Sequence, residues 1–408
     1  MRVEQNSLWK LKALIEQIDQ LLLSDFPHDD TRLALQLIRE QLAPQEERIK
    51  SAVVRKREDF IIAACETVNL RIYDYLPILG FLLRSTNVRN SFESYDALVQ
   101  IASSLIDNPK VVMSSEWDFS PLTYPMTLPG LPDFVLLGMP TSESGNALIL
   151  PLAGHELGHS LWEEGKLAES VANETIKYIV ASASDFKRAY SDYSNATITP
   201  QLLEQDMFLN GLISEVVKQV VSQIEELFCD AVGVSLFGAS FVQAFHYLLA
   251  PGMGGDMRNP RYPKLSTRAY CIENFGGVDL NAIGLEDFSK EFPDTGAPGG
   301  LRDAFVYKMV DDLALAEAPQ AYRNALDLLI KKAGHHLPTA EGEEEVYKMF
   351  AHEIPSGHPT SLADILNAGW RFVREKGDSL EDFEPISELM LKSIEVLEYR
   401  RRLSDAGL

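Results

Sequence analysis

Two short stretches decide the fold of this chain: Gly154-His155-Glu156-Leu157-Gly158-His159 and Glu225-Glu226-Leu227-Phe228-Cys229-Asp230-Ala231-Val232-Gly233. The first has the pattern HExxH. On a helix, this spacing puts His155 and His159 one turn apart on the same face, where both imidazoles can bind one metal ion. Glu156 lies about 100° further round the helix. There it can accept a proton from a water molecule at the metal. The first stretch therefore predicts a helix that supplies two metal ligands and a general base.

The second stretch is expected to supply the third metal ligand. Glu226 and Asp230 are four residues apart and share one helix face. The Glu226 carboxylate can bind zinc, and the Asp230 carboxylate can accept the second ring N–H of a ligand histidine. Gly233 lies on the same face and leaves room for two helices to approach closely. Glu225 competes for the ligand role, but it lies nearer the apolar face and has no aspartate four residues later.

Together the two stretches resemble the gluzincins, the thermolysin-like zinc peptidases, which pair HExxH with a downstream helix carrying Glu-x-x-x-Asp. The matching residues are His155, Glu156, His159, Glu226 and Asp230. The resemblance implies a zincin core, with an edge strand over the cleft and two helices that bind the metal. It also implies hydrolysis of peptide bonds, with Zn²⁺ as the cofactor and a peptide or protein as the substrate.

Two other patterns of zinc peptidases do not fit. The metzincin extension requires Gly and His at positions where this chain has Trp162 and Gly165. The GxMxN signature of aminopeptidases does not precede the HExxH motif. The sequence therefore favours an endopeptidase of the gluzincin type.

The proposed chemistry also needs a hydrogen-bond donor that stabilises the oxyanion. The candidates downstream of the second stretch are His246, Tyr262, Arg268 and Tyr270, of which Tyr262 and Arg268 are preferred. A strand predicted at Phe134–Leu137 is a candidate for pairing with an extended substrate backbone.

Helical periodicity and turn residues divide the chain into three predicted regions. These are a helical N-terminal region at 1–108, a zincin-like catalytic core at 109–275 and a helical C-terminal region at 276–408. The sequence therefore predicts a mostly α (α+β) protein, in which a zincin-like core with a small β-sheet lies between helical regions.

Some individual elements are also predicted from the pattern of apolar residues. Strands are expected at Val111–Met113 and Phe134–Leu137, and a helical pattern covers Gln45–Tyr73. The stretch Ile213–Leu249 is expected to form one long helix or two in series.

Composition excludes several other classes of protein. The chain of 408 residues has 37 Lys and Arg against 60 Asp and Glu, a net charge of −23. This balance argues against nucleic acid and anionic membranes as partners. No stretch approaches the ~20 apolar residues of a membrane span, and the N-terminus lacks the apolar core of a signal peptide. Cys65, Cys229 and Cys271 form no CxxC pair, so we expect buried free thiols and a cytoplasmic location.

Two alternatives remain open. In the first, the chain is a helical interaction or regulatory protein with a structural or inactive zinc site. A structural zinc site would need a fourth protein ligand. In the second, it is a dedicated protease whose helical flanks bind a protein partner.

Overall fold

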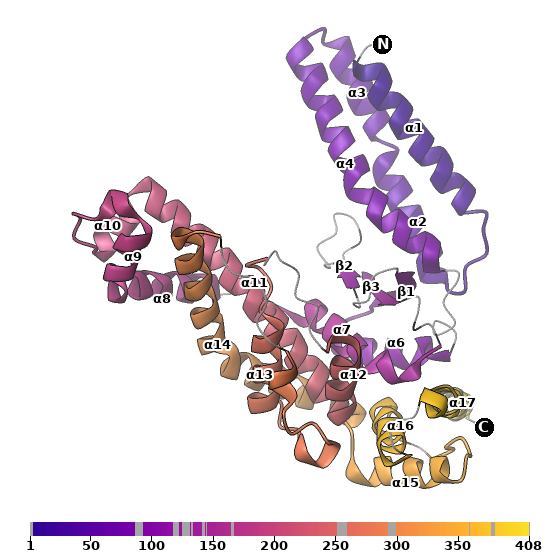
Figure 1. Cartoon of the computed structure of the whole chain (residues 1–408). Helices are drawn as coiled ribbons and strands as arrows, with labels where there is room; N and C mark the ends of the chain where they lie inside the picture. Colours follow the sequence, from indigo (N-terminus) through magenta and orange to yellow (C-terminus); the bar gives the residue numbers. More distant parts are fainter. Residues whose placement is uncertain are drawn as a thin grey trace. The chain divides into compact units, whose positions relative to one another are not determined.

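The computed structural model describes residues 3–85, 93–116, 122–124, 131, 134–140, 143, 145–164, 167–250, 259–292, 299–358, 360–376 and 380–407. Helices dominate these residues, and the prediction of a mostly α protein is confirmed (Figure 1). The chain divides into two compact units. The first comprises Met1–Ala147 with Leu391–Leu408, and the second comprises Leu148–Met390.

The first unit is built on amphipathic helices. They are α1 (Val3–Leu21), α2 (Asp29–Leu42), α3 (Gln45–Val54), α4 (Glu58–Arg84) and α6 (Tyr95–Leu105). In α1 the buried apolar residues Leu11, Leu14, Ile18 and Leu21 recur every three or four positions, so they form one face. This face joins buried residues of α2 and α4 in a common hydrophobic core.

The helical pattern predicted over Gln45–Tyr73 is confirmed, and the structure divides it between α3 and α4. Lys56 lies at the break and has a φ of 56°. A residue in this left-handed region cannot continue a right-handed helix. The sequence does not show the break, because lysine carries none of the turn signals of glycine, asparagine or proline.

A three-stranded sheet completes the first unit. Its strands are β1 (Lys110–Glu116), β2 (Leu122–Tyr124) and β3 (Phe134–Pro140), arranged in the order β1-β3-β2. β3 is parallel to β1, with Lys110 opposite Phe134, and antiparallel to β2, with Leu122 opposite Gly138. The two predicted strands, within β1 and β3, are confirmed, and β2 was not predicted.

The position of β3 in the sheet bears on its predicted pairing with substrate. All seven residues of β3 are buried. Leu136 and Leu137 already pair with Tyr124 and Thr123 of β2. A substrate strand cannot occupy these two positions while β2 does, so the predicted pairing is contradicted there.

The second unit is entirely helical in its described residues. Its α-helices begin with α7 (Ala153–Leu161), α8 (Leu167–Ala181), α9 (Ala183–Ala189), α10 (Pro200–Gln205), α11 (Met207–Phe237) and α12 (Ala239–Leu249). They continue with α13 (Leu265–Phe275), α14 (Leu301–Ala333), α15 (Ala340–Ala351) and α16 (Leu362–Lys376). A last helix, α17 (Leu380–Asp405), contributes to both units. Short 3₁₀ turns include η3 (Ala147–Leu152), which leads into α7.

The long helix α11 is the centre of the second unit. It packs against α7, α8, α13 and α14. It ends at Gly238, whose φ of 58° separates α11 from α12. Of the two predictions for Ile213–Leu249, two helices in series is the correct one.

The two units differ from the three predicted regions. The sheet was expected in the core at 109–275, but β1 packs against α2, α4 and α6 and so belongs with the N-terminal helices. The region after residue 275 was expected to be separate, but α14 packs along α11. Packing between distant segments, which sequence patterns do not report, sets these groupings.

No helix in the described part of the chain is long and apolar enough to cross a membrane. Cys65, Cys229 and Cys271 are buried and free, as predicted.

Candidate metal centre

Helices α7 and α11 approach each other closely because small residues line their contact. A Cβ atom added to Gly158 of α7 would lie 2.7 Å from the Cα atom of Cys229. One turn earlier, a Cβ atom added to Gly154 would lie 2.9 Å from the Cα atom of Gly233. The close approach expected at Gly233 is present, and it brings the two predicted motifs together.

Replacement of Gly158 by alanine is expected to destabilise the protein by about 1–3 kcal/mol, the usual cost of overpacking. The new methyl group would meet the backbone of Cys229, which cannot move as a flexible side chain can. Gly211→Ala on α11 is the matched control. No atom lies within 4 Å of its added Cβ, so it should stabilise by up to about 1 kcal/mol. Urea unfolding compares the two, and equal stability for both would contradict the packing described.

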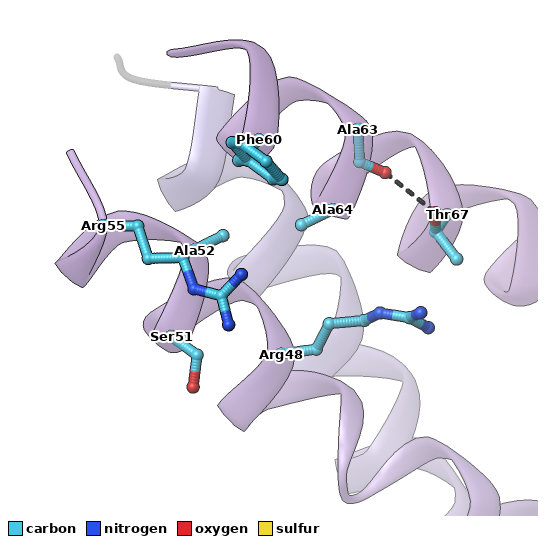
Figure 2. A pocket seen from close by; sticks show the side chains of 8 residues that line it. All are labelled: Arg48, Ser51, Ala52, Arg55, Phe60, Ala63, Ala64 and Thr67. Atoms are coloured by element: carbon cyan, nitrogen blue, oxygen red, sulfur yellow. Dashed lines mark hydrogen bonds between the residues drawn. The ribbon is translucent and has the colours of Figure 1, made fainter. Parts of the chain in front are cut away.

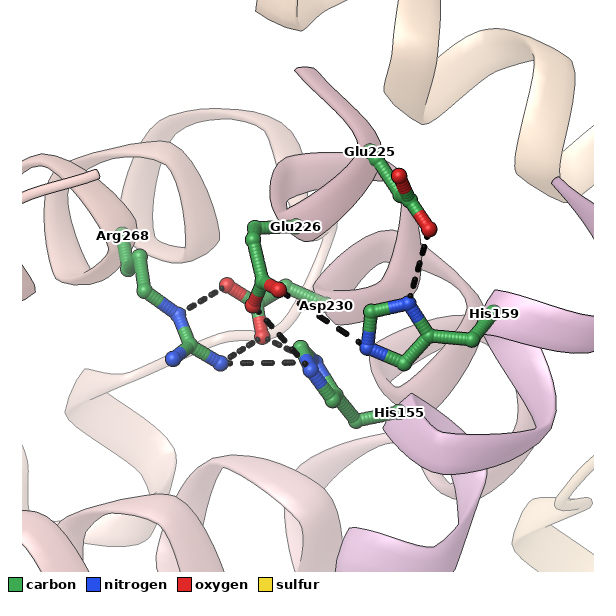
Figure 3. Close-up of polar contacts among 6 residues, drawn as sticks. All are labelled: His155, His159, Glu225, Glu226, Asp230 and Arg268. Carbon is green, nitrogen blue, oxygen red and sulfur yellow. Dashed lines mark hydrogen bonds and ion pairs between the residues drawn. The ribbon is translucent and has the colours of Figure 1, made fainter. Parts of the chain in front are cut away.

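The two histidines of α7 face one carboxylate of α11. The distance from His155 Nε2 to Glu226 Oε2 is 3.4 Å, and that from His159 Nε2 to Glu226 Oε1 is 3.8 Å. The imidazole ring centroids are 5.1 Å apart. Figure 3 shows Glu226 with both rings turned toward it. The structure therefore brings together the three residues predicted as metal ligands.

The other ring nitrogen of each histidine is held by a second carboxylate. His155 Nδ1 lies 2.9 Å from Asp230 Oδ1, and His159 Nδ1 lies 3.0 Å from Glu225 Oε1 (Figure 3). An ionised carboxylate only accepts hydrogen bonds, so each Nδ1 is assigned as the donor. In the neutral tautomer this leaves the lone pair of each Nε2 directed toward Glu226. Carboxylates orient metal-binding histidines in the same way.

Arg268 of α13 fixes Asp230 in turn. Its Nε donates to Asp230 Oδ2 at 2.8 Å and one terminal nitrogen donates to Oδ1 at 2.6 Å. That terminal nitrogen is also 3.3 Å from His155 Nδ1. The guanidinium group lies over the ring of Phe245, with 5.2 Å from its carbon to the centroid. Asp230 is fully buried, so this pairing offsets the cost of burying its charge.

Charges in the site favour a cation between the two helices. Burial alone would lower the pKa of His155, but its hydrogen bonds with Asp230 and Glu226 raise that pKa to about 10. Burial alone would raise the pKa of Asp230, but Arg268 and His155 lower it to about 2. The pKa of Glu226 is lowered against the effect of burial, mainly by its hydrogen bond with His155. A site that holds two carboxylates ionised and attracts a proton onto a histidine also suits a metal cation.

The separations between each histidine Nε2 and the Glu226 carboxylate are close to those expected between two zinc ligands. Bonds from zinc to nitrogen and oxygen are about 2.0–2.2 Å, so two ligands at a tetrahedral ion lie roughly 3.3–3.6 Å apart. The separation of 3.4 Å between His155 Nε2 and Glu226 Oε2 lies within this range. The separation of 3.8 Å between His159 Nε2 and Glu226 Oε1 is slightly larger. Two imidazoles and a carboxylate are also a usual donor set for zinc.

Cys229 competes with Glu226 for the third ligand position. Its Sγ and one nitrogen each of His155 and His159 lie within 4.8 Å of one another. A zinc ligand must be a thiolate, however. Without a metal ion, burial, followed by the charge of Glu226, raises the pKa of the Cys229 thiol well above its usual value, but a bound zinc ion would itself deprotonate the thiol. We favour Glu226 as the ligand because the Nε2 atoms of both histidines lie close to its carboxylate.

Glu156 and Tyr262 lie beside this centre. Glu156 is on α7 next to His155 and is 4% exposed. Tyr262 is 55% exposed, and burial, followed by the charges of Glu226, Glu225 and Glu156, raises the pKa of its phenol. The phenol therefore keeps its proton near neutral pH and can donate a hydrogen bond.

The turn that carries Tyr262 is anchored to the ligand helix. The buried side chain of Gln223, three residues before Glu226, donates from Nε2 to the backbone oxygen of Pro260 at 2.8 Å. Lys264, at the end of the turn, lies 3.7 Å from Asp311 of α14. These contacts hold Tyr262 close to the carboxylates of the site.

The remaining candidates for the oxyanion donor are less suited to donate a hydrogen bond to a substrate at this site than Tyr262 is. Arg268 was preferred together with Tyr262, but its guanidinium group is committed to Asp230 through two hydrogen bonds. The position of Arg268 thus differs from the expectation, because its guanidinium group contacts Asp230 and His155. His246 Nε2 lies 2.8 Å from Glu291 Oε2. Tyr270 is on α13 and is partly exposed.

The structure gives Glu225 and Cys229 contacts in the site that the sequence did not predict. Glu225 was weighed as a rival zinc ligand, but it is the partner of His159 Nδ1. Cys229 was predicted only as a buried thiol, but it faces α7 at Gly158. One available signal was that Glu225 and Cys229 are four residues apart and share a helix face.

Comparisons of this chain with models of protein families, with curated proteins and with solved structures find no match, so its role is inferred from its own residues.

Proposed function

We propose that the protein is a zinc-dependent endopeptidase that hydrolyses peptide bonds in a peptide or protein substrate. One observation carries the proposal. Both Nδ1 atoms of the HExxH histidines are held by carboxylates, and both Nε2 atoms face Glu226. This arrangement supports three ligands from the protein and a coordination position left for water or substrate, as in catalytic zinc sites.

Each remaining residue has a chemical task in this proposal. Zinc, when bound, would polarise the scissile carbonyl and make a water molecule reactive near neutral pH. Glu156 accepts a proton from the attacking water and passes it to the leaving amine. Tyr262 donates a hydrogen bond to the oxyanion. Asp230, Glu225 and Arg268 hold the two imidazoles in orientation.

The resemblance to gluzincins enters the proposal through α7 and α11 alone. HExxH on α7, with Glu226 and Asp230 on α11, has the arrangement that the resemblance implies. We propose a zincin-like core around these two helices, with the helical flanks as candidate surfaces for a protein partner. A cytoplasmic location is proposed because all three cysteines are free thiols.

The proposal is tested by digestion of a mixture of unstructured peptides, with the products identified by mass spectrometry. The zinc-loaded protein is expected to cleave internal peptide bonds. A chelator should abolish cleavage and added zinc should restore it, because the attacking water depends on the metal. Absence of any cleavage by the folded, zinc-loaded protein would contradict the proposal.

The position of Cys229 favours a second candidate function. If its thiolate joined His155, His159 and Glu226, the four ligands would form a closed site, as in structural zinc sites. The chain would then be a helical interaction or regulatory protein. Variants of Glu226 and Cys229 separate the two candidates.

A further inference from the structure

A pocket in the first unit, between α3 and α4, is lined by two arginines without acidic partners. It has a volume of about 370 Å³ and includes Arg48 and Arg55 on the side of α3. Neither guanidinium group has an ion pair or hydrogen bond within the part of the chain that the structure describes. Figure 2 shows both side chains extending along the pocket beneath α4.

The space between the helices follows from the residues that face it. Arg48, Ala52 and Arg55 are separated by four and three residues, so they lie on one face. Ala63 and Ala64 of α4 line the opposite side. Alanine side chains end at the β-carbon, so they leave the space open where leucine or isoleucine would fill it.

The segment from Arg48 to Arg57 is basic although the chain is acidic, and the carboxylate of Glu47 accepts a hydrogen bond from Ser51, which lines the pocket. Five basic residues and no acidic residue lie between Arg48 and Arg57, whereas the whole chain has a net charge of −23. Lys50 pairs with Glu46, and Arg57 pairs with Asp59. Arg48 and Arg55, the two cations of this segment that line the pocket, have no carboxylate partner among the described residues, and Lys56 outside the pocket has none either.

Phe60 adds an apolar surface to the same pocket. It lines the pocket at the start of α4 and is 42% exposed. The guanidinium carbon of Arg57 lies 4.4 Å from the centre of the Phe60 ring, a contact that holds the ring in place. The pocket thus combines two free guanidinium groups with an aromatic side chain.

We propose that this pocket binds a small anion that carries more than one phosphate or carboxylate group. The guanidinium groups of Arg48 and Arg55 hold these groups, and Phe60 lines one side of the pocket. Planar guanidinium groups suit these anions because they donate two parallel hydrogen bonds to paired oxygens. The volume lies at the lower end of the range of about 300–1,000 Å³ for small-molecule sites, so a compact ligand is expected. This site is independent of the metal centre.

Calorimetric titration of the full-length protein with pyrophosphate and, separately, with citrate tests the proposal at constant ionic strength. Saturable binding of at least one anion is expected. Arg48→Gln and Arg55→Gln should each weaken it by roughly tenfold or more, because each removes a charged hydrogen-bond donor. Lys50→Gln is the matched control. This substitution removes the same charge from α3, but Lys50 does not line the pocket. The anion affinity of the variant should therefore stay within about twofold of that of the wild type.

Hydrogen exchange measured with and without the anion locates the binding. Protection at α3 and at the start of α4 is expected in the wild type and should be absent in the double variant of Arg48 and Arg55. Preference for pyrophosphate or for citrate identifies the ligand as a phosphate or a carboxylate. Failure of both anions to bind, or equal affinity in the double variant, would overturn the proposal.

Discussion

Replacement of Glu156 by glutamine is expected to lower peptide hydrolysis by roughly 10²- to 10⁴-fold, the usual contribution of a general base. Glutamine has nearly the same shape as glutamate but cannot accept the proton of the attacking water. His155, His159 and Glu226 remain in place, so the zinc content should not change. The rate of cleavage and the metal content are measured on the same preparation.

Glu163→Gln is the matched control for this variant. Glu163 is exposed, lies just beyond the end of α7, and its replacement removes the same charge. Its hydrolysis rate should remain close to that of the wild type. If Glu156→Gln retained the wild-type rate with zinc bound, Glu156 would not be the base and the proposed chemistry would fail.

Replacement of Glu226 by alanine is expected to weaken zinc binding by more than about 100-fold. Loss of a carboxylate that merely orients a ligand histidine typically costs 10–100-fold, and loss of a direct ligand should cost more. Glu225→Gln should therefore have the smaller effect, since Glu225 contacts zinc only through His159. Competition with a zinc-binding dye measures all affinities on one scale.

Cys229→Ala tests the alternative ligand in the same assay. It is expected to keep most of the zinc affinity, because the Nε2 atoms of both histidines lie close to the carboxylate of Glu226. The reverse order, with zinc lost in Cys229→Ala and kept in Glu226→Ala, would assign the ligand role to the cysteine. A loss in both variants would indicate the closed, structural site.

The candidate ligand residues could be predicted from the sequence because their relation depends on local spacing. A spacing of four residues on a helix fixes which side chains share a face, so His155 with His159 and Glu226 with Asp230 followed from the sequence. The close approach of α7 and α11 was also predicted in part from Gly233, since a residue without a side chain permits close packing.

The remainder depends on contacts between segments that are distant in the sequence. Arg268 comes from α13, and no spacing rule could show that it faces Asp230. The choice of Glu225 as the partner of His159 depends on the rotation of α11 against α7. The grouping of the sheet with the N-terminal helices and the break at Lys56 likewise arise from packing and from one backbone angle.

The zinc content of protein purified without added zinc or chelator tests the central claim most directly, with His155→Ala as the control. We predict about one zinc ion per wild-type chain, since the Nε2 atoms of His155 and His159 both lie close to the Glu226 carboxylate, and essentially none in the variant. A well-folded wild-type protein that contains no zinc and cannot be loaded with it would contradict the account.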